Sequence, residues 1–396
     1  MTKNDDKRVQ VLRFKGFNDD WAQRKLKDLT DVRDGTHSSP KYVEAGHPFI
    51  TSKNINNGSI DYRDIKYITD EDFDEINKRS KVDIHDILMG MIGTVGNLAL
   101  IDKKPNFAIK NIALIKDIGK IDYLFLYNFL QSNYVSKELI QKLDGGTQKF
   151  ISLNKVRDLN ISVASFQEQK AISKCLMRVN NLLILQQRKL QQLKLLKKAM
   201  LQDLFTDKNV PKLRFNGFDA NWIQCKLEKE ALLTMGQSPS GSTYSDQPST
   251  YILVQGNADL KNGWVKPRIW TTQITKLAKK GDIIITVRAP AGKVGRTNFD
   301  VVLGRGVASI QGNDFIFYLL SKMDMNKYWK KYAAGSTFES INSNDIKNTR
   351  VHVPNLPEQN RIANLFLRLD DLIRFQQNKL NNLQKNKQFL LQNMFI

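Results

Sequence analysis

The sequence predicts an α+β fold in which two globular α/β domains are separated by an antiparallel two-helix coiled coil and related by a pseudo-two-fold internal repeat. Three observations support this prediction. A leader segment occurs twice, a long heptad helix occurs twice, and the segments between them have the pattern of short strands followed by one helix. The chain has 396 residues, the usual length of two or three domains, and its apolar fraction of 41% is sufficient for buried cores.

The leader opens each copy of the repeat. The segment DKRVQVLRFKGFNDDWAQRKL, which begins at Asp6, returns as DKNVPKLRFNGFDANWIQCKL from Asp207. Nine of the fifteen positions from Leu12 to Leu26 are identical in the second copy, and Trp21 is among them. Self-similarity of this kind indicates a duplicated architecture. The interiors that follow scarcely align. We therefore expect two globular domains that share the leader and the helix but differ in the segments between them.

Each interior is predicted to contain several strands and one helix. Short apolar runs bounded by turn residues indicate strands, and a longer run with helical spacing follows them. The expected strands cover residues 48–52, 86–93, 97–101 and 107–115 in the first copy and 250–256, 282–289, 301–305 and 307–310 in the second. The expected helices cover residues 121–143 and 314–332. Strand-rich segments followed by a helix favour an α+β domain over a doubly wound sheet.

A heptad helix closes each copy. Apolar residues recur there at alternating steps of four and three, which is typical of a coiled-coil seam. The predicted seam residues are Ile172, Leu176, Val179, Leu183, Gln186, Leu190 and Leu193 in the first copy and Ile362, Phe366, Leu369, Ile373, Gln376, Leu380 and Leu383 in the second. The span from 172 to 204 corresponds to a rod of about 50 Å at 1.5 Å per residue. If the second helix buries its seam against the first, the two helices must be antiparallel.

These elements divide the chain into four predicted segments. The first globular domain covers 1–165 and its helix 166–205, and the second domain covers 206–353 and its helix 354–396.

The charge indicates a polyanionic partner. Lys and Arg number 61 against 40 Asp and Glu, a net charge of +21. This excess favours nucleic acid, or otherwise an anionic membrane surface. No run of 18 apolar residues and no apolar signal core is present, which predicts no transmembrane helix and no signal peptide, and we expect no membrane partner. The two cysteines, Cys175 and Cys225, provide neither a disulfide framework nor a zinc site, so we expect a reduced, cytoplasmic protein.

The residues of common catalytic sites are missing, which predicts a chain that is not an enzyme. The four histidines are scattered without the spacing of a metal site, and no phosphate-binding GxxxxGK[ST] loop occurs. Neither the [ND]PP[YF] run of amino-methyltransferases nor the Pro-Asp of a PD…ExK nuclease is present. Glu168 does begin an ExK triplet, but in the first turn of a helix it is better explained by the helix dipole and capping.

Several small, polar, Gly-containing loops are candidates for contact with DNA. Asn, Gln, Lys and Arg are suited to base edges and phosphates, and small polar loops approach a duplex closely. The candidate residues are Thr36, His37, Ser38, Lys53, Asn54 and Lys149 in the first copy and Gln237, Ser238, Gln255, Asn257, Arg288, Lys293 and Arg296 in the second. The alternative, that these are ordinary solvated loops, stays open.

The chain resembles the specificity subunit of a Type I restriction-modification system. The resemblance lies in the leader LRF-x-GF…W at both starts, the GT/ST…I turn before each helix, and the stretch VPNLPEQNRIANLFLRLDDLI…KLNNLQKNKQFLLQNMF. It extends over essentially the whole chain. The first copy departs from it with ASFQEQ where the second has PNLPEQ, so the start of the first helix is expected to be shaped differently.

The resemblance implies a role in DNA target recognition. Each globular domain would read one half of a bipartite, asymmetric sequence in double-stranded DNA, and the helical pair would set the length of the unread gap. The helices would also bind two modification subunits, which carry S-adenosylmethionine and methylate adenine. Restriction subunits that use ATP and magnesium would join for cleavage, and this chain itself would hold no cofactor.

Two other functions are alternatives to this one. The first is a DNA methyltransferase or nuclease that acts alone, which the missing motifs oppose. The second is a coiled-coil adaptor without a role in nucleic-acid binding, which the net charge of +21 and the two dissimilar interiors oppose.

Overall fold

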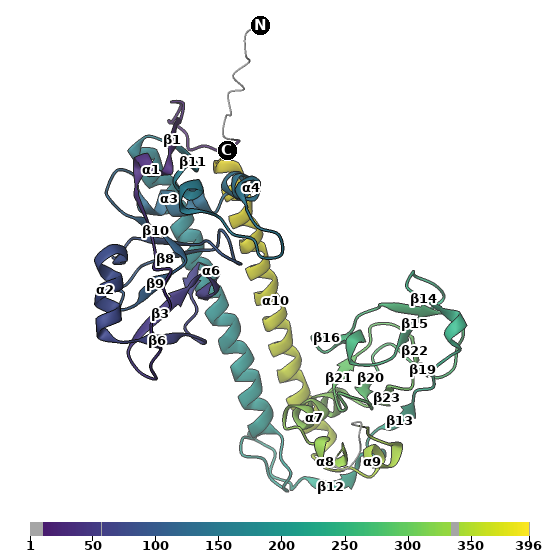
Figure 1. Ribbon diagram of the computed structural model, residues 1–396. Helices are drawn as coiled ribbons and strands as arrows, with labels where there is room; N and C mark the ends of the chain where they lie inside the picture. The colour runs from purple at the N-terminus through teal and green to yellow at the C-terminus, as the bar shows by residue number, and fades with distance from the viewer. Residues whose placement is uncertain (1–10, 57, 334–339, 396) are drawn as a thin grey trace. The chain divides into compact units, whose positions relative to one another are not determined.

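The computed structural model describes residues 11–56, 58–333 and 340–395, which form two compact units. Unit 1 consists of Met1–Gln187 and Asn378–Ile396, and unit 2 consists of Arg188–Gln377. Each unit holds a mixed α/β domain and part of both long helices, α6 (Phe166–Leu204) and α10 (Leu356–Met394) (Figure 1). The predicted fold class is confirmed. The division of the chain at 165, 205 and 353 stays a prediction, because the unit boundaries fall within the helices.

The domain of unit 1 is built from short strands and helices. In chain order they are β1 (Ala22–Lys25), α1 (Leu26–Leu29), β2 (Asp31–Asp34), β3 (His47–Thr51), η1 (Ser52–Asn54), β4 (Ile55–Asn56), β5 (Ser59–Ile60), β6 (Lys66–Ile68), α2 (Asp70–Ser80), β7 (Ile87–Gly90), β8 (Leu98–Leu100), β9 (Ala108–Lys110), β10 (Ile112–Lys116), α3 (Tyr123–Leu130), α4 (Asn133–Lys142), α5 (Leu153–Arg157) and β11 (Asn160–Val163). The strands form an antiparallel sheet of order β2-β10-β7-β8, a sheet of order β6-β3-β9, and the pairs β1-β11 and β4-β5.

In the described residues, the domain of unit 2 has more strands and fewer α-helices than that of unit 1. Its elements are β12 (Ile223–Lys226), η2 (Leu227–Lys229), β13 (Leu232–Met235), η3 (Gly241–Thr243), β14 (Tyr244–Ser245), β15 (Tyr251–Val254), η4 (Asn257–Asp259), β16 (Leu260–Lys261), β17 (Trp264–Val265), β18 (Ile269–Thr271), β19 (Leu277–Ala278), β20 (Ile283–Thr286), β21 (Val294–Arg296), β22 (Val301–Leu303), β23 (Val307–Gln311), α7 (Asp314–Met325), α8 (Lys330–Ala333), α9 (Ser343–Lys347) and β24 (Arg350–Val353). The sheets have the orders β13-β23-β20-β21-β17-β16 and β14-β18-β15-β22-β19, beside the pair β12-β24.

The sequence repeat is also a repeat of topology. The order β13-β23-β20-β21 in unit 2 matches β2-β10-β7-β8 in unit 1, and β12-β24 matches β1-β11. The parallel pair β3-β9 returns as the parallel pair β15-β22. The differences are additions at the sheet edges: unit 1 inserts α2 between β6 and β7, where unit 2 inserts β19. The two domains therefore share one framework of strands but differ in the elements inserted into it, as the leader repeat predicts.

Three predicted elements are divided in the structure. Segment 107–115 is two strands, β9 and β10, separated at Asn111, whose φ of 54° lies in the left-handed region. Segment 121–143 is two helices, because the Ser132 side chain accepts a hydrogen bond from the backbone N–H of Val135 and begins a new helix, α4. Segment 314–332 is divided into α7 and α8 around Lys327, which has a φ of 56°. Apolar periodicity alone does not reveal these breaks.

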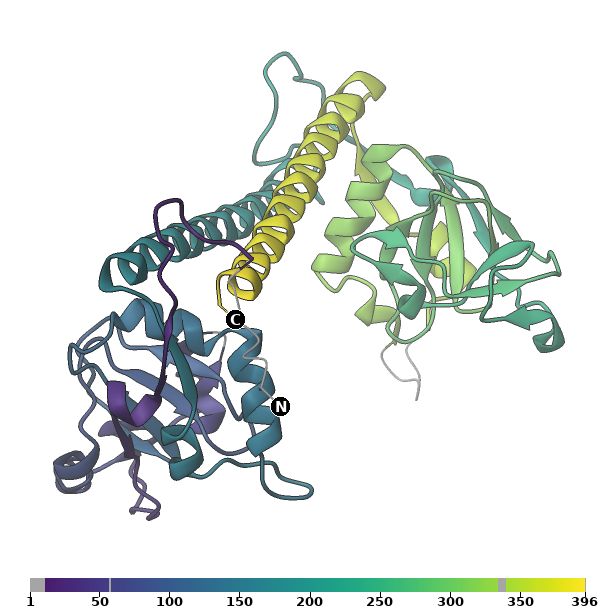
Figure 2. The ribbon, with the colours of Figure 1, turned by 90° about the horizontal axis from the view of Figure 1, so that it is seen from above.

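In unit 1 the end of α10 packs against the start of α6. Leu391 and Phe395 share a core with Ile172 and Leu176. The Phe395 ring lies 6.3 Å from the ring of Trp21, and the backbone N–H of Leu12 donates to Asn393 O at 2.9 Å. Figure 2 shows the leader running past these paired helix ends. The two helices are therefore antiparallel in this unit.

The same arrangement recurs in unit 2 with the roles of the helices exchanged. Phe205, at the end of α6, lies 5.7 Å from Phe366 near the start of α10, measured between ring centroids. Leu204 and Ile362 belong to the same core. The backbone N–H of Leu213 in the second leader donates to Asp203 O at 2.9 Å. This bond is the counterpart of the bond from Leu12 to Asn393 O in unit 1. The helices are antiparallel here as well.

The predicted seam positions are the protected positions of both helices. All fourteen predicted seam residues are buried or half-buried. Between 181 and 199, the residues of α6 that do not belong to the seam are all exposed, except for the half-buried Lys197. Gln376 is buried and Gln186 half-buried. Lys197 donates to the Asp370 carboxylate at 2.5 Å in unit 2. In unit 1 its repeat counterpart Lys387 donates to the Gln131 amide oxygen at 3.3 Å, and burial lowers the pKa of this ammonium group.

Candidate nucleic-acid interface

A buried carboxylate attaches the leader of unit 1 to α6. Arg13 donates two hydrogen bonds to Glu168, from Nε at 2.7 Å and from Nη2 at 2.8 Å, and Trp21 Nε1 donates a third at 3.1 Å. Glu168 is only 1% exposed. Glu168 is the acidic residue in the first turn of α6, as the helix-dipole explanation predicts, while Ser165 Oγ accepts a bond from its backbone N–H and the carboxylate binds the leader. The helix is thus fixed to the domain that precedes it.

The identical attachment exists in unit 2. Arg214 donates to Glu358 from Nε at 2.9 Å and from Nη2 at 2.8 Å, and Trp222 Nε1 donates at 3.4 Å. These residues are the leader and helix positions that the two copies share. The sequence repeat is therefore explained by a structural requirement, namely to attach a domain rigidly to a helix.

In unit 1 the loops that follow β2 and β9 cross each other. The N–H of Gly35 donates to Ile112 O at 3.0 Å, and the N–H of Thr36 donates to Ile109 O at 3.0 Å. Between these two carbonyls lie residues 110–111, here termed the crossing loop of unit 1. A Cβ atom on Gly35 would lie 2.7 Å from Ile109 O, so the two backbones are in direct contact.

Unit 2 has the same crossing. The N–H of Gly236 donates to Val307 O at 3.0 Å, and the N–H of Gln237 donates to Leu303 O at 2.9 Å. The crossing loop of unit 2, residues 304–306, is one residue longer than that of unit 1. The equivalent hydrogen bonds place the two predicted polar loops, which begin after Gly35 and Gly236, at corresponding positions of the framework.

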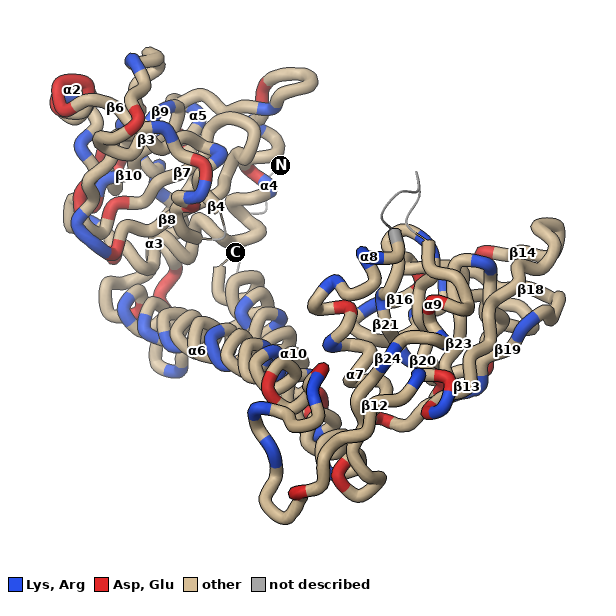
Figure 3. Tube along the Cα trace, turned by 90° about the horizontal axis from the view of Figure 1, so that it is seen from below, with Lys and Arg blue, Asp and Glu red and all other residues tan. Residues whose placement is uncertain are grey.

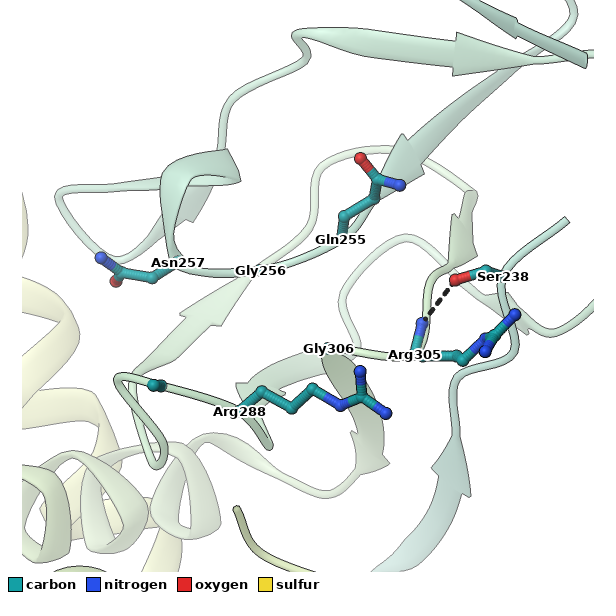
Figure 4. A pocket seen from close by; sticks show the side chains of 8 residues that line it. Ser238, Gln255, Gly256, Asn257, Arg288, Arg305 and Gly306 are labelled. Carbon is teal, nitrogen blue, oxygen red and sulfur yellow. Dashed lines mark hydrogen bonds between the residues drawn. The ribbon is translucent and has the colours of Figure 1, made fainter. Parts of the chain in front are cut away.

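A cleft of about 340 Å³ opens at the crossing of unit 2. Figure 4 shows side chains from four loops around it. The lining includes four residues that the sequence predicts, and it adds the charged Arg305, which the sequence did not predict. The polar and charged side chains that line the cleft are Ser238, Gln255, Asn257, Arg288 and Arg305, next to Gly256, Ala289 and Gly306. The lining contains no acidic side chain, so it suits the acceptor groups of a nucleic acid.

The two arginines of the cleft are exposed and have no acidic partner among the described residues. Four other arginines of unit 2 lie against carboxylates, which compensate their charge. These paired arginines are Arg214, Arg268, Arg296 and Arg374, which bind Glu358, Asp259, Asp314 and Asp371. Arg288 and Arg305 thus place two uncompensated positive charges at the cleft.

Three predicted residues of unit 2 lie outside the cleft. Gln237 is exposed beside it, and its carbonyl accepts a hydrogen bond from Thr275. Lys293 donates to the Asp324 carboxylate at 2.9 Å. Arg296 is 14% exposed, pairs with Asp314 and stacks on the Phe317 ring. DNA contact by Arg296 stays a prediction, and its guanidinium is already paired with Asp314.

In unit 1 the predicted residues of the first loop lie at the crossing. Thr36 and Ser38 exchange a hydrogen bond of 2.7 Å. His37 lies between the Asp34 carboxylate, 2.6 Å from Nε2, and the Asn111 side chain, 2.8 Å from Nδ1. Asn111 belongs to the crossing loop. Polar side chains therefore gather at the same framework position as in unit 2, but with different chemistry.

The other predicted residues of unit 1 are dispersed. Lys53 is exposed and pairs with Asp64 at 3.3 Å, and Lys149 is exposed and donates to the Gly145 carbonyl at 2.9 Å. Asn54 is 4% exposed, and its amide binds backbone groups within its own loop. DNA contact by Asn54 stays a prediction, and its amide is already bonded within its own loop.

Sequence reasoning missed Arg305. The triplet GRG joins two apolar strands, β22 and β23, and the apolar pattern conceals the loop. The signal was present in the two glycines, which mark close backbone approach inside a strand-like pattern.

No group of three or more His, Cys, Asp or Glu side chains is placed to hold a metal ion in the described parts of the chain. Of the helices within residues 11–56, 58–333 and 340–395, none is both long and apolar enough to cross a membrane.

Comparisons with known proteins agree on one family. The model of the Type I restriction modification DNA specificity domain matches residues 18–195 and again 234–385. The candidate MjaX specificity subunit of a type I restriction enzyme from Methanocaldococcus jannaschii is 29% identical over 94% of this chain and 92% of its own length.

Two solved structures share the fold. A chain from a study of complex assembly and conformational transition of the type I R-M system superposes with a TM-score of 0.62 at 21% identity, covering 95% of this chain and 97% of that one. The S subunit of the Type I restriction-modification system from M. genitalium has a TM-score of 0.61 at 14% identity, covering 98% and 99%. With two family matches over most of its length, the chain belongs to the family of Type I restriction modification DNA specificity domains.

Proposed function

We propose that this chain is the DNA-reading specificity subunit of a Type I restriction-modification complex and that each unit reads one half of a bipartite target. One observation carries the proposal. The two units share a framework down to the hydrogen bonds at the crossing, but the side chains placed there differ: His37 and Asn111 in unit 1, and Ser238 and Arg305 in unit 2. Readers of two unlike half-sites require a fixed scaffold with variable loops.

The charge supports a long polyanion as the ligand. Figure 3 shows the positions of Lys and Arg distributed along the backbone trace of each unit and along α6. The net charge is +21. Basic side chains spread over a surface bind a duplex through its phosphates, and the reading of bases is left to a few loops.

The modification subunits are proposed to bind along the helices, and the antiparallel pair is proposed to set the gap between the half-sites. Apolar side chains away from the seam support this part of the proposal. Leu182, Ile184, Leu185 and Leu195 of α6 are 46–58% exposed, as Phe375 of α10 is at 67%. Exposed apolar surface on a charged helix is typical of a protein interface. S-adenosylmethionine, ATP and magnesium would be held by the modification and restriction subunits.

The experiment is a reconstitution of the chain with its modification subunits. The complex is expected to methylate adenines in one bipartite, asymmetric motif when S-adenosylmethionine is supplied, as read by sequencing of the modified bases. Its affinity for a duplex with that motif should fall about 10³–10⁵-fold between 50 and 200 mM salt if about six to ten phosphates are contacted. Fluorescence anisotropy over a salt series measures this slope.

Two control reactions separate the rival functions. Methylation by this chain alone would identify a stand-alone enzyme and refute the proposal. A complete complex whose affinity for DNA does not respond to salt or sequence would identify an adaptor.

A further inference from the structure

The crossing loop of unit 2 holds its central residue at a fixed backbone position. A Cβ atom on Gly306 would lie 2.1 Å from the Gln255 carbonyl oxygen, and one on Gly236 would lie 2.1 Å from Gly304 O. The backbone N–H of Arg305 donates to Ser238 Oγ at 3.0 Å. Three loops are thus in direct contact around Arg305, and the absence of side chains at the glycines permits this contact.

The side chain of Arg305 is free although its backbone is fixed. It is exposed at the rim of the cleft, and no described residue forms an ion pair with it. Arg288, from the loop after β20, extends into the same cleft, with the amides of Gln255 and Asn257 across from it (Figure 4). Neither amide forms a side-chain hydrogen bond with another residue in the described part of the chain, so all four side chains present unused donors.

Unit 1 has different chemistry at the corresponding place. Its crossing loop is Lys110-Asn111, and both side chains already bind the first loop, Lys110 at Ser39 and Asn111 at His37. No arginine lies there. The two units therefore differ in the side chains that the common framework presents at the crossing.

We propose that Arg305 reads a guanine in the half-site bound by unit 2. This inference rests on the proposed function and adds to it the residue and the base. Arginine recognises guanine by two parallel hydrogen bonds to O6 and N7 in the major groove, the most common specific contact of proteins with DNA. A phosphate contact tolerates a mobile loop, whereas base reading requires a fixed distance from the scaffold to the base edge. The immobile backbone of Arg305 meets that requirement, and Gln255 and Asn257 are suited to neighbouring bases.

The test compares methylated motifs of complexes that carry Arg305→Gln, Arg305→Lys or the original residue. The half-site of unit 2 is first identified as the one that stays unchanged when residues 30–150 are exchanged for those of another family member. At one position of that half-site, both variants are expected to lose the preference for guanine, which is roughly tenfold to a hundredfold for one bidentate pair. Lysine keeps the charge but not the planar pair of donors, so charge alone does not rescue the preference.

Lys280→Ala is the matched control. Lys280 is exposed in the turn before β20, at the opposite end of this strand from Arg288, and its removal also deletes one positive charge. It should leave the motif unchanged. The inference is overturned if the Arg305 variants keep the guanine and only methylate all sites less, which would identify a phosphate contact, or if the altered position lies in the other half-site. An original complex without any sequence preference would instead refute the proposed function.

Discussion

Replacement of Phe395 by alanine is expected to destabilise unit 1 by about 3–5 kcal/mol and to leave unit 2 unchanged. Phe395 is 2% exposed, and its ring lies 5.5 Å from the rings of Phe125 and Phe129. A residue at the end of α10 thus belongs to the core of the domain at the other end of the sequence, and its loss leaves a cavity there. Hydrogen exchange measured by mass spectrometry resolves the two units, with β10 reporting on unit 1 and β23 on unit 2.

Phe389→Ala on the same helix is the control for this prediction. Its side chain is 56% exposed, so its truncation should change the free energy of unfolding by less than about 0.5 kcal/mol. Faster exchange in unit 2, or unaltered exchange in unit 1, after Phe395→Ala would contradict the antiparallel arrangement of helix ends.

Replacement of Glu358 by alanine is expected to destabilise unit 2 by about 3 kcal/mol. The carboxylate is 1% exposed and accepts three hydrogen bonds from the second leader, so its loss leaves the Arg214 guanidinium, 14% exposed, without its partner. Removal of one member of a buried pair costs about 3–5 kcal/mol, and the partial exposure of the arginine places the expected value at the lower end. Urea denaturation followed by hydrogen exchange in β12 and β24 measures the effect.

Asp371→Ala provides the comparison on the same helix. Its pair with Arg374 is about two-thirds exposed on both sides, and such a pair contributes about 0.5 kcal/mol or less. If both variants lost the same stability, the leader would not depend on Glu358 for its attachment.

The features of the fold that follow from periodicity were predictable. The steps of four and three from Ile172 and from Ile362 identified both helices and their protected faces, because one helical stripe must be buried. Breaks within elements were not predictable in this way. The division at Ser132 depends on a side-chain cap and the division at Asn111 on a left-handed backbone, and neither alters the apolar pattern around it.

Only part of the candidate site was predictable, because local sequence shows which loops are polar but not which loops meet in the fold. Small polar loops after Gly35 and Gly236 are visible in the sequence, but their meeting with the crossing loops depends on strand pairing over more than 60 residues. Burial of Asn54 and pairing of Arg296 depend likewise on distant partners. Residue type identified candidates for DNA contact, and only tertiary structure separated free side chains from compensated ones.

The central claim is that two independent readers are carried by one framework. Exchange of residues 30–150 for those of another family member, followed by sequencing of the bases methylated by the reconstituted complex, tests it most directly. The account predicts that one half-site changes while the other half-site and the gap stay as they were. A motif in which both half-sites change together would contradict it.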